Sequence, residues 1–171
     1  MEKGREFLRA QVNNGIMLHQ TLLRNLEDHA KQAEDSRYRE LCERYLLKTR
    51  DLQRSLSEYG ETIGADAKGG VKGAIGAVLG MARDAVDSLR ETDFLRLVGD
   101  IVTMRQAQDT FATFAAVGDR INEKRLAEIG RNGEREHDEM QREFNQLVQS
   151  MFVAHVQGSA TTSAEARPEV R

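Results

Sequence analysis

Apolar residues recur at intervals of three and four along four stretches of the chain, at about residues 6–33, 37–63, 92–117 and 123–156. This spacing brings them onto one face of an α-helix, so each stretch predicts an amphipathic helix with one buried side. Proline occurs once in 171 residues, at Pro168, so no proline interrupts any of the four. We therefore expect an all-α protein.

The lengths of the connections between these helices favour one arrangement of a bundle. The first pair and the last pair of helices are joined by short links, whereas residues 64–91 separate the pairs. A connection of that length can return along the whole bundle. We predict a ferritin-like four-helix bundle over residues 1–157, with a long crossover that carries a short extra helix. Residues 158–171 are rich in Ser, Thr and Ala and predict a disordered tail.

Composition argues against several classes of protein. A net charge of -3 disfavours binding to nucleic acid through a basic surface. The single cysteine, Cys42, cannot form an internal disulfide, which favours a reducing, cytoplasmic setting. The apolar run at residues 73–82 is about half the length that crosses a bilayer. We expect a cytoplasmic protein with no membrane span.

Polar or small residues interrupt each of the four apolar stripes near its middle. Within each pair of antiparallel helices the interruptions fall at similar heights, so we interpret them as a polar layer inside the bundle. Gly15 and His19 mark this level on the first helix. On the other helices its members are Lys48, Thr49, Gln108, Glu134 and His137. Lys48 is predicted to pair with Glu134 or Asp100, because a charge buried alone is costly.

Glu134 and His137 are three residues apart, so they share one face of a helix. Di-metal carboxylate bundles use such a Glu-x-x-His pair on each of two helices and one Glu on each of the other two. Completed by His19 and Asp100, this pair could hold iron or manganese. Lys48 would repel a metal ion, however, and histidines on apolar stripes are usually hydrogen-bonded core residues. Both interpretations stay open: a centre without a cofactor, and a residual metal site.

Four segments also resemble parts of one known protein family. Phe7-Leu8-Arg9 resembles the opening of its first helix, and residues 45–49 stand where it has His-Leu-Glu-Glu-Thr. Residues 73–89 resemble its crossover helix, and residues 133–139 stand where it has Glu-Glu followed by Thr-Asp. The family is that of the YciE/YciF-like ferritin-like stress proteins of bacteria, and the resemblance spans about residues 7–150. It implies a ferritin-like bundle and a role in stress.

The resemblance also implies which residues stand at the family's metal positions. These positions fall on Gly15 and Lys48 in the first two helices, and neither residue is a useful ligand. Asp100 is the nearest candidate in the third helix, and only Glu134 and His137 match a ligand pair. We therefore expect a non-catalytic, stress-associated or accessory interaction protein with a degenerate metal centre. The alternative is a residual iron- or manganese-binding oxidoreductase.

The third helix carries more large apolar residues than one narrow stripe can hold. They are Phe94, Phe111, Phe114 and Val117. An apolar face wider than a monomer can cover is typical of a protein interface. We predict a homodimer through this face, with another protein as a possible partner.

Overall fold

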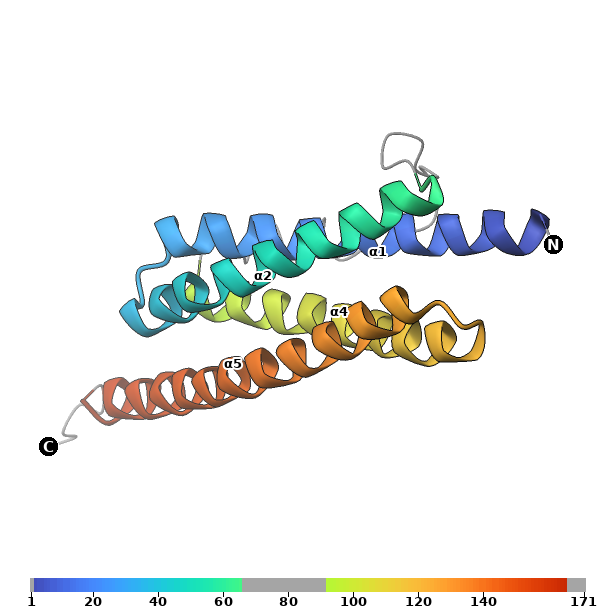
Figure 1. Cartoon of the computed structure of the whole chain (residues 1–171). Helices are drawn as coiled ribbons and strands as arrows, with labels where there is room; N and C mark the ends of the chain where they lie inside the picture. Colours follow the sequence, from blue (N-terminus) through green and yellow to red (C-terminus); the bar gives the residue numbers. More distant parts are fainter. Residues whose placement is uncertain (1, 66–91, 166–171) are drawn as a thin grey trace, which may run out of the picture.

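The computed structural model describes residues 2–65 and 92–165, and the side chains as far as residue 158. Within these ranges the chain forms helices and no strands, so the all-α prediction is confirmed for this part (Figure 1). The helices are α1 (Glu2–Gln32), α2 (Ser36–Ile63), α4 (Asp93–Arg120) and α5 (Lys124–Glu165). The extra helix predicted within the crossover lies outside the described residues.

The helices pack as a bundle in which each has two close neighbours. α1 packs against α2 and α4, and α5 packs against α4 and α2. Adjacent helices run in opposite directions, whereas α2 and α4 run in the same direction (Figure 1). Consequently α1 faces α5 across one diagonal of the bundle, and α2 faces α4 across the other.

Two hydrogen bonds show which ends of the bundle the connection between α2 and α4 joins. Arg9 Nε on α1 donates to the carbonyl oxygen of Ile63 at 2.6 Å, so α2 ends beside the first turns of α1. The backbone N–H of Asp35, in the α1–α2 turn, donates to Asp93 Oδ2 at 2.7 Å, so α4 begins beside that turn. The chain between Ile63 and Asp93 therefore links opposite ends of the bundle.

The core consists of two apolar clusters separated along the bundle axis. One contains Leu26, Tyr38, Met104 and Phe144, and the other contains Val12, Leu56, Phe111 and Leu126. Three buried polar residues lie between these clusters, because along its helix each stands between a residue of one cluster and a residue of the other. They are His19 on α1, Thr49 on α2 and His137 on α5. A band of polar side chains therefore crosses the middle of the core.

α4 and α5 approach each other closely because small residues face each other. A Cβ atom added to Gly118 would lie 2.5 Å from the backbone nitrogen of Ala127, and one on Gly130 would meet the backbone of Ala115. α5 continues to Glu165, past its predicted end near residue 156. The predicted tail is thus helical over residues 158–165. None of the described helices has the length and apolar character required to span a membrane.

Candidate functional site: two buried polar clusters

The first cluster is a pair of histidines that meet across the bundle. His19 and His137 are each 1% exposed, and their ring centroids lie 5.1 Å apart. The ring of Phe111 on α4 packs against both, with centroid distances of 5.3 Å to His19 and 5.2 Å to His137. The two imidazoles and this phenyl ring form the centre of the polar band.

The hydrogen-bond partners of the two rings determine which nitrogen carries the proton. His19 Nδ1 lies 2.7 Å from Gln53 Oε1. The Gln53 amide nitrogen donates to the carbonyl oxygen of Ile16, which fixes Oε1 as the acceptor for His19. His137 Nδ1 donates to the carbonyl oxygen of Gly133 at 2.7 Å. Both protons therefore sit on Nδ1, and each Nε2 presents a lone pair.

Burial keeps both imidazoles neutral. Burial, together with the neighbouring His137, lowers the pKa of His19 from 6.5 to about 3, although the hydrogen bond that His19 donates to Gln53 acts in the opposite direction. Burial also lowers the pKa of His137 from 6.5 to about 4. Among the described residues, neither Nε2 atom has a hydrogen-bond partner. At neutral pH the centre thus holds two uncharged rings with two unused acceptors.

Glycines in the helical stripes make room for aromatic rings at this level. A Cβ atom on Gly133 would collide with the ring of Phe111, and one on Gly15 would lie 2.7 Å from the ring of Phe114. Both phenylalanines come from α4 and are at most 4% exposed. Rings from α4 therefore pack directly on Gly15, a predicted metal position, and on Gly133, which precedes the predicted ligand pair Glu134 and His137.

The second cluster joins α1, α2 and α4. The Tyr38 hydroxyl donates to Asp100 Oδ2 at 2.7 Å, and His29 Nδ1 lies 2.8 Å from the same oxygen. Tyr38 is fully buried and Asp100 is 1% exposed. Burial and the Asp100 carboxylate raise the pKa of Tyr38, so its hydroxyl remains protonated and can donate. Asp100 Oδ1 has no partner among the described residues.

Sequence reasoning missed His29 and the role of Tyr38 in this cluster. His29 follows the buried Leu26 by three residues, so helical spacing alone places it toward the interior. Tyr38 stands three residues before the buried Leu41 and carries a hydroxyl that needs a partner. The inward positions of His29 and Tyr38 could have indicated that these two side chains need a buried acceptor, such as Asp100.

The predicted metal residues are divided between separate places. His19 and His137 are in contact, whereas Asp100 is bonded to His29 and Tyr38. Glu134 is half-buried on α5. Within the described residues, no group of three or more His, Cys, Asp or Glu side chains is arranged to hold a metal ion.

The other members of the predicted polar layer have ordinary structural partners. Thr49 is buried, and its hydroxyl donates to the carbonyl oxygen of Tyr45 at 2.8 Å. The Gln108 amide is half-buried and lies 3.4 Å from Asp138 Oδ1 on α5. The Thr49 hydroxyl thus links two turns of α2, and the Gln108 amide links α4 to α5. Neither contact creates an open site.

Lys48 lies on the surface and pairs with Glu139, so the prediction of a buried or half-buried ion pair with Glu134 or Asp100 is wrong. Its side chain is 49% exposed, and Nζ lies 3.2 Å from Glu139 Oε2 on α5. Positions 48 and 49 both fit the apolar stripe of α2. Thr49 takes the inward position, which leaves the lysine chain free to reach water.

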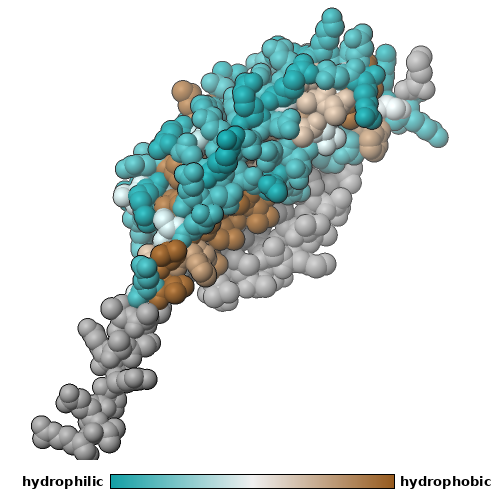
Figure 2. All heavy atoms as spheres, turned by 90° about the horizontal axis from the view of Figure 1, so that it is seen from below, coloured by the Kyte–Doolittle hydropathy of each residue, from teal (hydrophilic) through white to brown (hydrophobic). Residues whose placement is uncertain are grey.

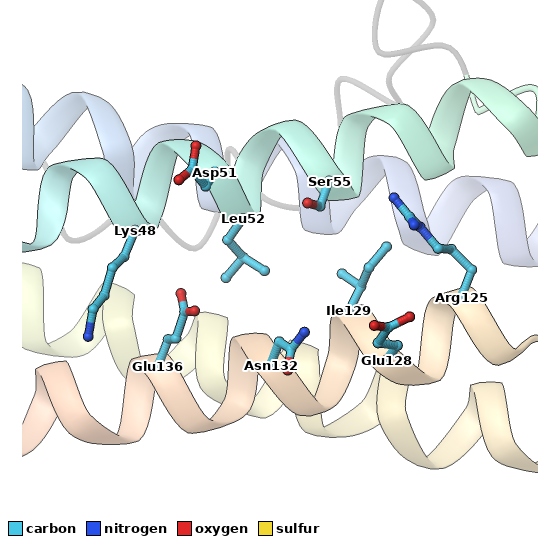
Figure 3. Close-up of a pocket in the computed structure, with 9 residues that line it drawn as sticks. All are labelled: Lys48, Asp51, Leu52, Ser55, Arg125, Glu128, Ile129, Asn132 and Glu136. Atoms are coloured by element: carbon cyan, nitrogen blue, oxygen red, sulfur yellow. The ribbon is translucent and has the colours of Figure 1, made fainter.

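A groove of about 250 Å³ separates α2 from α5 on the surface near Lys48 (Figure 3). Leu52 and Ile129 line its wall, and its rim carries charges of both signs. The charged lining residues are Lys48, Asp51, Arg125, Glu128 and Glu136. Burial raises the pKa of the Glu136 carboxyl group. With cations and carboxylates interspersed, the groove has no strong preference for a ligand of one charge.

Apolar side chains are exposed near the end of the bundle where α4 begins. Phe111 and Phe114 are buried within the chain, so they cannot form the wide outer face from which the homodimer was predicted. The large apolar residues exposed on this part of α4 and α5 are instead Val98, Val102, Phe152, Val153 and Val156. The ring of Phe94 lies 6.2 Å from that of Phe152 and connects the α4 and α5 parts of this apolar patch. Figure 2 shows apolar atoms gathered on the face of the molecule that is seen from below.

Comparisons of the chain with protein-family models, with curated proteins and with solved structures found no match.

Proposed function

We propose that the chain is a ferritin-like bundle in which packed side chains replace the metal centre, and that it serves as a non-catalytic interaction protein. The arrangement of the helices supports the first part. Neighbouring helices are antiparallel, α2 and α4 are parallel, and their connection joins opposite ends of the bundle. These are features of bundles with one long crossover.

The packing of Phe111 on Gly133 carries the proposal. The ring contacts both His19 and His137 in the middle of the core, where di-metal bundles hold their ions. Oxygen chemistry at such ions needs several carboxylate ligands and an open coordination position. The ring occupies this space, and the buried carboxylate of Asp100 is bonded elsewhere.

The alternative is an iron- or manganese-dependent oxidoreductase that uses Glu134, His137, His19 and Asp100. One observation favours it, because the Nε2 atoms of His19 and His137 are buried and unpartnered among the described residues. The contacts of Asp100 weigh against it, because its Oδ2 atom is already hydrogen-bonded to both His29 and Tyr38.

Metal analysis after aerobic loading separates the two functions. The purified chain is incubated with Fe(II) or Mn(II), desalted, and its metal content measured beside that of His137→Gln. We expect far less than one ion per chain in both proteins, because in the part of the chain that the structure describes no carboxylates converge on the histidine pair. A near-stoichiometric content that disappears with the substitution would show a metal site at His137, as the alternative requires, and would overturn the proposal.

The apolar patch supports the interaction role, because exposed apolar side chains gathered on one surface are typical of interfaces. We propose that a second copy of the chain covers it, in a stress-associated or accessory setting. Light scattering after size exclusion would give the mass of wild type, of Phe152→Asp, and of Phe7→Asp as a control at the other end of the bundle. We expect dimers for wild type and the control, and a monomer for Phe152→Asp. A monomeric wild type would contradict this arrangement.

A further inference from the structure

We propose that His19 and His137 together bind one soft monovalent cation, copper(I), through their two Nε2 atoms. The inference does not depend on the proposed interaction role. It starts from two imidazole rings that are in contact with each other and whose Nε2 atoms are both buried without a partner among the described residues. Leaving such groups unpaired in a protein interior is costly, so a ligand that uses both lone pairs would be stabilised there.

Each ring is already held in the orientation that a metal-binding histidine needs. The Nδ1–H of His19 donates to Gln53 Oε1, and the Nδ1–H of His137 donates to the carbonyl oxygen of Gly133. Histidine ligands usually donate their second nitrogen to such an oxygen, which fixes the tautomer and aims the other lone pair at the metal. Here both rings have the same tautomer, so each of the two adjacent rings keeps its Nε2 lone pair for a ligand.

The charge of the surroundings selects the kind of cation. Among the described residues, no carboxylate forms a hydrogen bond or an ion pair with either imidazole. A divalent ion between two neutral ligands would leave two uncompensated charges in the core, whereas a monovalent ion leaves one. Copper(I) is a d10 ion that is stable with two nitrogen ligands. Zinc and iron(II) need four or more ligands, which this pair cannot supply.

The layer next to the pair is also suited to a soft cation. Met140 follows His137 by three residues, so it lies on the same face of α5 one turn further on. Met140 and Met104 are buried, and both belong to the apolar cluster that adjoins the polar band. Thioether sulfur favours copper(I) over hard divalent ions. On the other side, the Phe111 ring packs against both imidazoles and excludes water.

The direct test is an anaerobic titration of the full chain with copper(I) in competition with a coloured copper(I) chelator. We expect one ion per chain in wild type, and loss of that ion in His19→Gln and in His137→Gln. Two controls should retain it. His155→Gln removes an exposed imidazole, and Cys42→Ala removes the only thiol of the sequence. Binding that vanishes with Cys42→Ala, or survives both histidine substitutions, would overturn the proposal.

A measurement on wild type keeps the test valid if a histidine variant fails to fold. In ¹⁵N-labelled protein, copper(I) should shift the Nε2 resonances of His19 and His137 while both Nδ1 atoms remain protonated. Zn(II) and Fe(II) should leave those resonances unchanged. Unshifted Nε2 signals would mean that the pair holds water only, and equal shifts with Zn(II) would rule out selection for a monovalent ion. Either result would contradict the proposal.

Discussion

The Tyr38 hydroxyl on α2 donates to the Asp100 carboxylate on α4 at 2.7 Å, across one diagonal of the bundle. The imidazoles of His19 and His137 meet across the other diagonal. Each diagonal thus has its own buried polar contact, made between helices that share few other contacts. Directional contacts of this kind specify how the two helical hairpins fit together, because apolar packing alone tolerates several registers.

Removing the Tyr38 hydroxyl should destabilise the chain. In Tyr38→Phe the buried Asp100 carboxylate loses a donor, and the expected loss in free energy of unfolding is about 1–3 kcal/mol. Tyr45→Phe is a matched control, because its hydroxyl donates to Glu143, which is one-third exposed. The control should lose less than Tyr38→Phe in urea denaturation. Equal losses in free energy of unfolding would show that the buried hydrogen bond to Asp100 contributes no more than the partly exposed one to Glu143.

Gly133→Ala should be destabilising although alanine is the better helix former. The added Cβ would collide with the ring of Phe111, and overpacking of this kind costs about 1–3 kcal/mol. At Gly99, also within a helix, an added Cβ would meet nothing within 4 Å. Gly99→Ala should therefore raise stability by about 0.5–1 kcal/mol. Thermal unfolding of the two variants measures both effects, and a stabilised Gly133→Ala would refute the packing described.

Acid should weaken the fold through the histidine pair. Native His137 has its pKa lowered from 6.5 to about 4, so between these values the unfolded chain binds more protons. The free energy of unfolding therefore falls as pH drops below 6.5, and the loss levels off below about 4. For His137 the loss is on the order of 3 kcal/mol. Urea midpoints of wild type should fall across this window more steeply than those of His137→Gln, and parallel curves would contradict the effect.

The helices and the polar band could be predicted because both follow from residue spacing. Apolar stripes at intervals of three and four marked all four described helices, and His19 and His137 stood out as polar residues on those stripes. Their contact with each other could not be predicted, because it depends on how the hairpins align, and spacing within one helix does not report that. For the same reason, Asp100 was predicted to lie with His19 and His137, whereas it bonds to His29 and Tyr38.

Lys48 shows a second limit of reasoning from spacing. Positions 48 and 49 fit the stripe of α2 equally well, and only the cost of burying an ammonium group decides which faces inward. Glu139 on α5 then provides a partner at the surface. The end of α5 was misplaced because Gly158 and the following Ser and Thr residues are typical of a tail, whereas the helix continues to Glu165.

Lys48→Ala should change stability by less than about 1 kcal/mol, because an exposed ion pair contributes little. Chemical denaturation at low and high salt would show the small contribution being screened. Breaking a buried pair would instead cost about 3–5 kcal/mol. A loss of that size in Lys48→Ala would indicate that the lysine is buried in an ion pair, which would contradict its surface position.

Oxygen uptake on addition of Fe(II) tests most directly whether the centre is closed to oxygen chemistry. The rate with wild type should equal the rate in buffer, because Phe111 packed on Gly133 leaves no open di-metal site. A rate that rises in proportion to the protein and returns to the buffer value in His137→Gln would contradict the account.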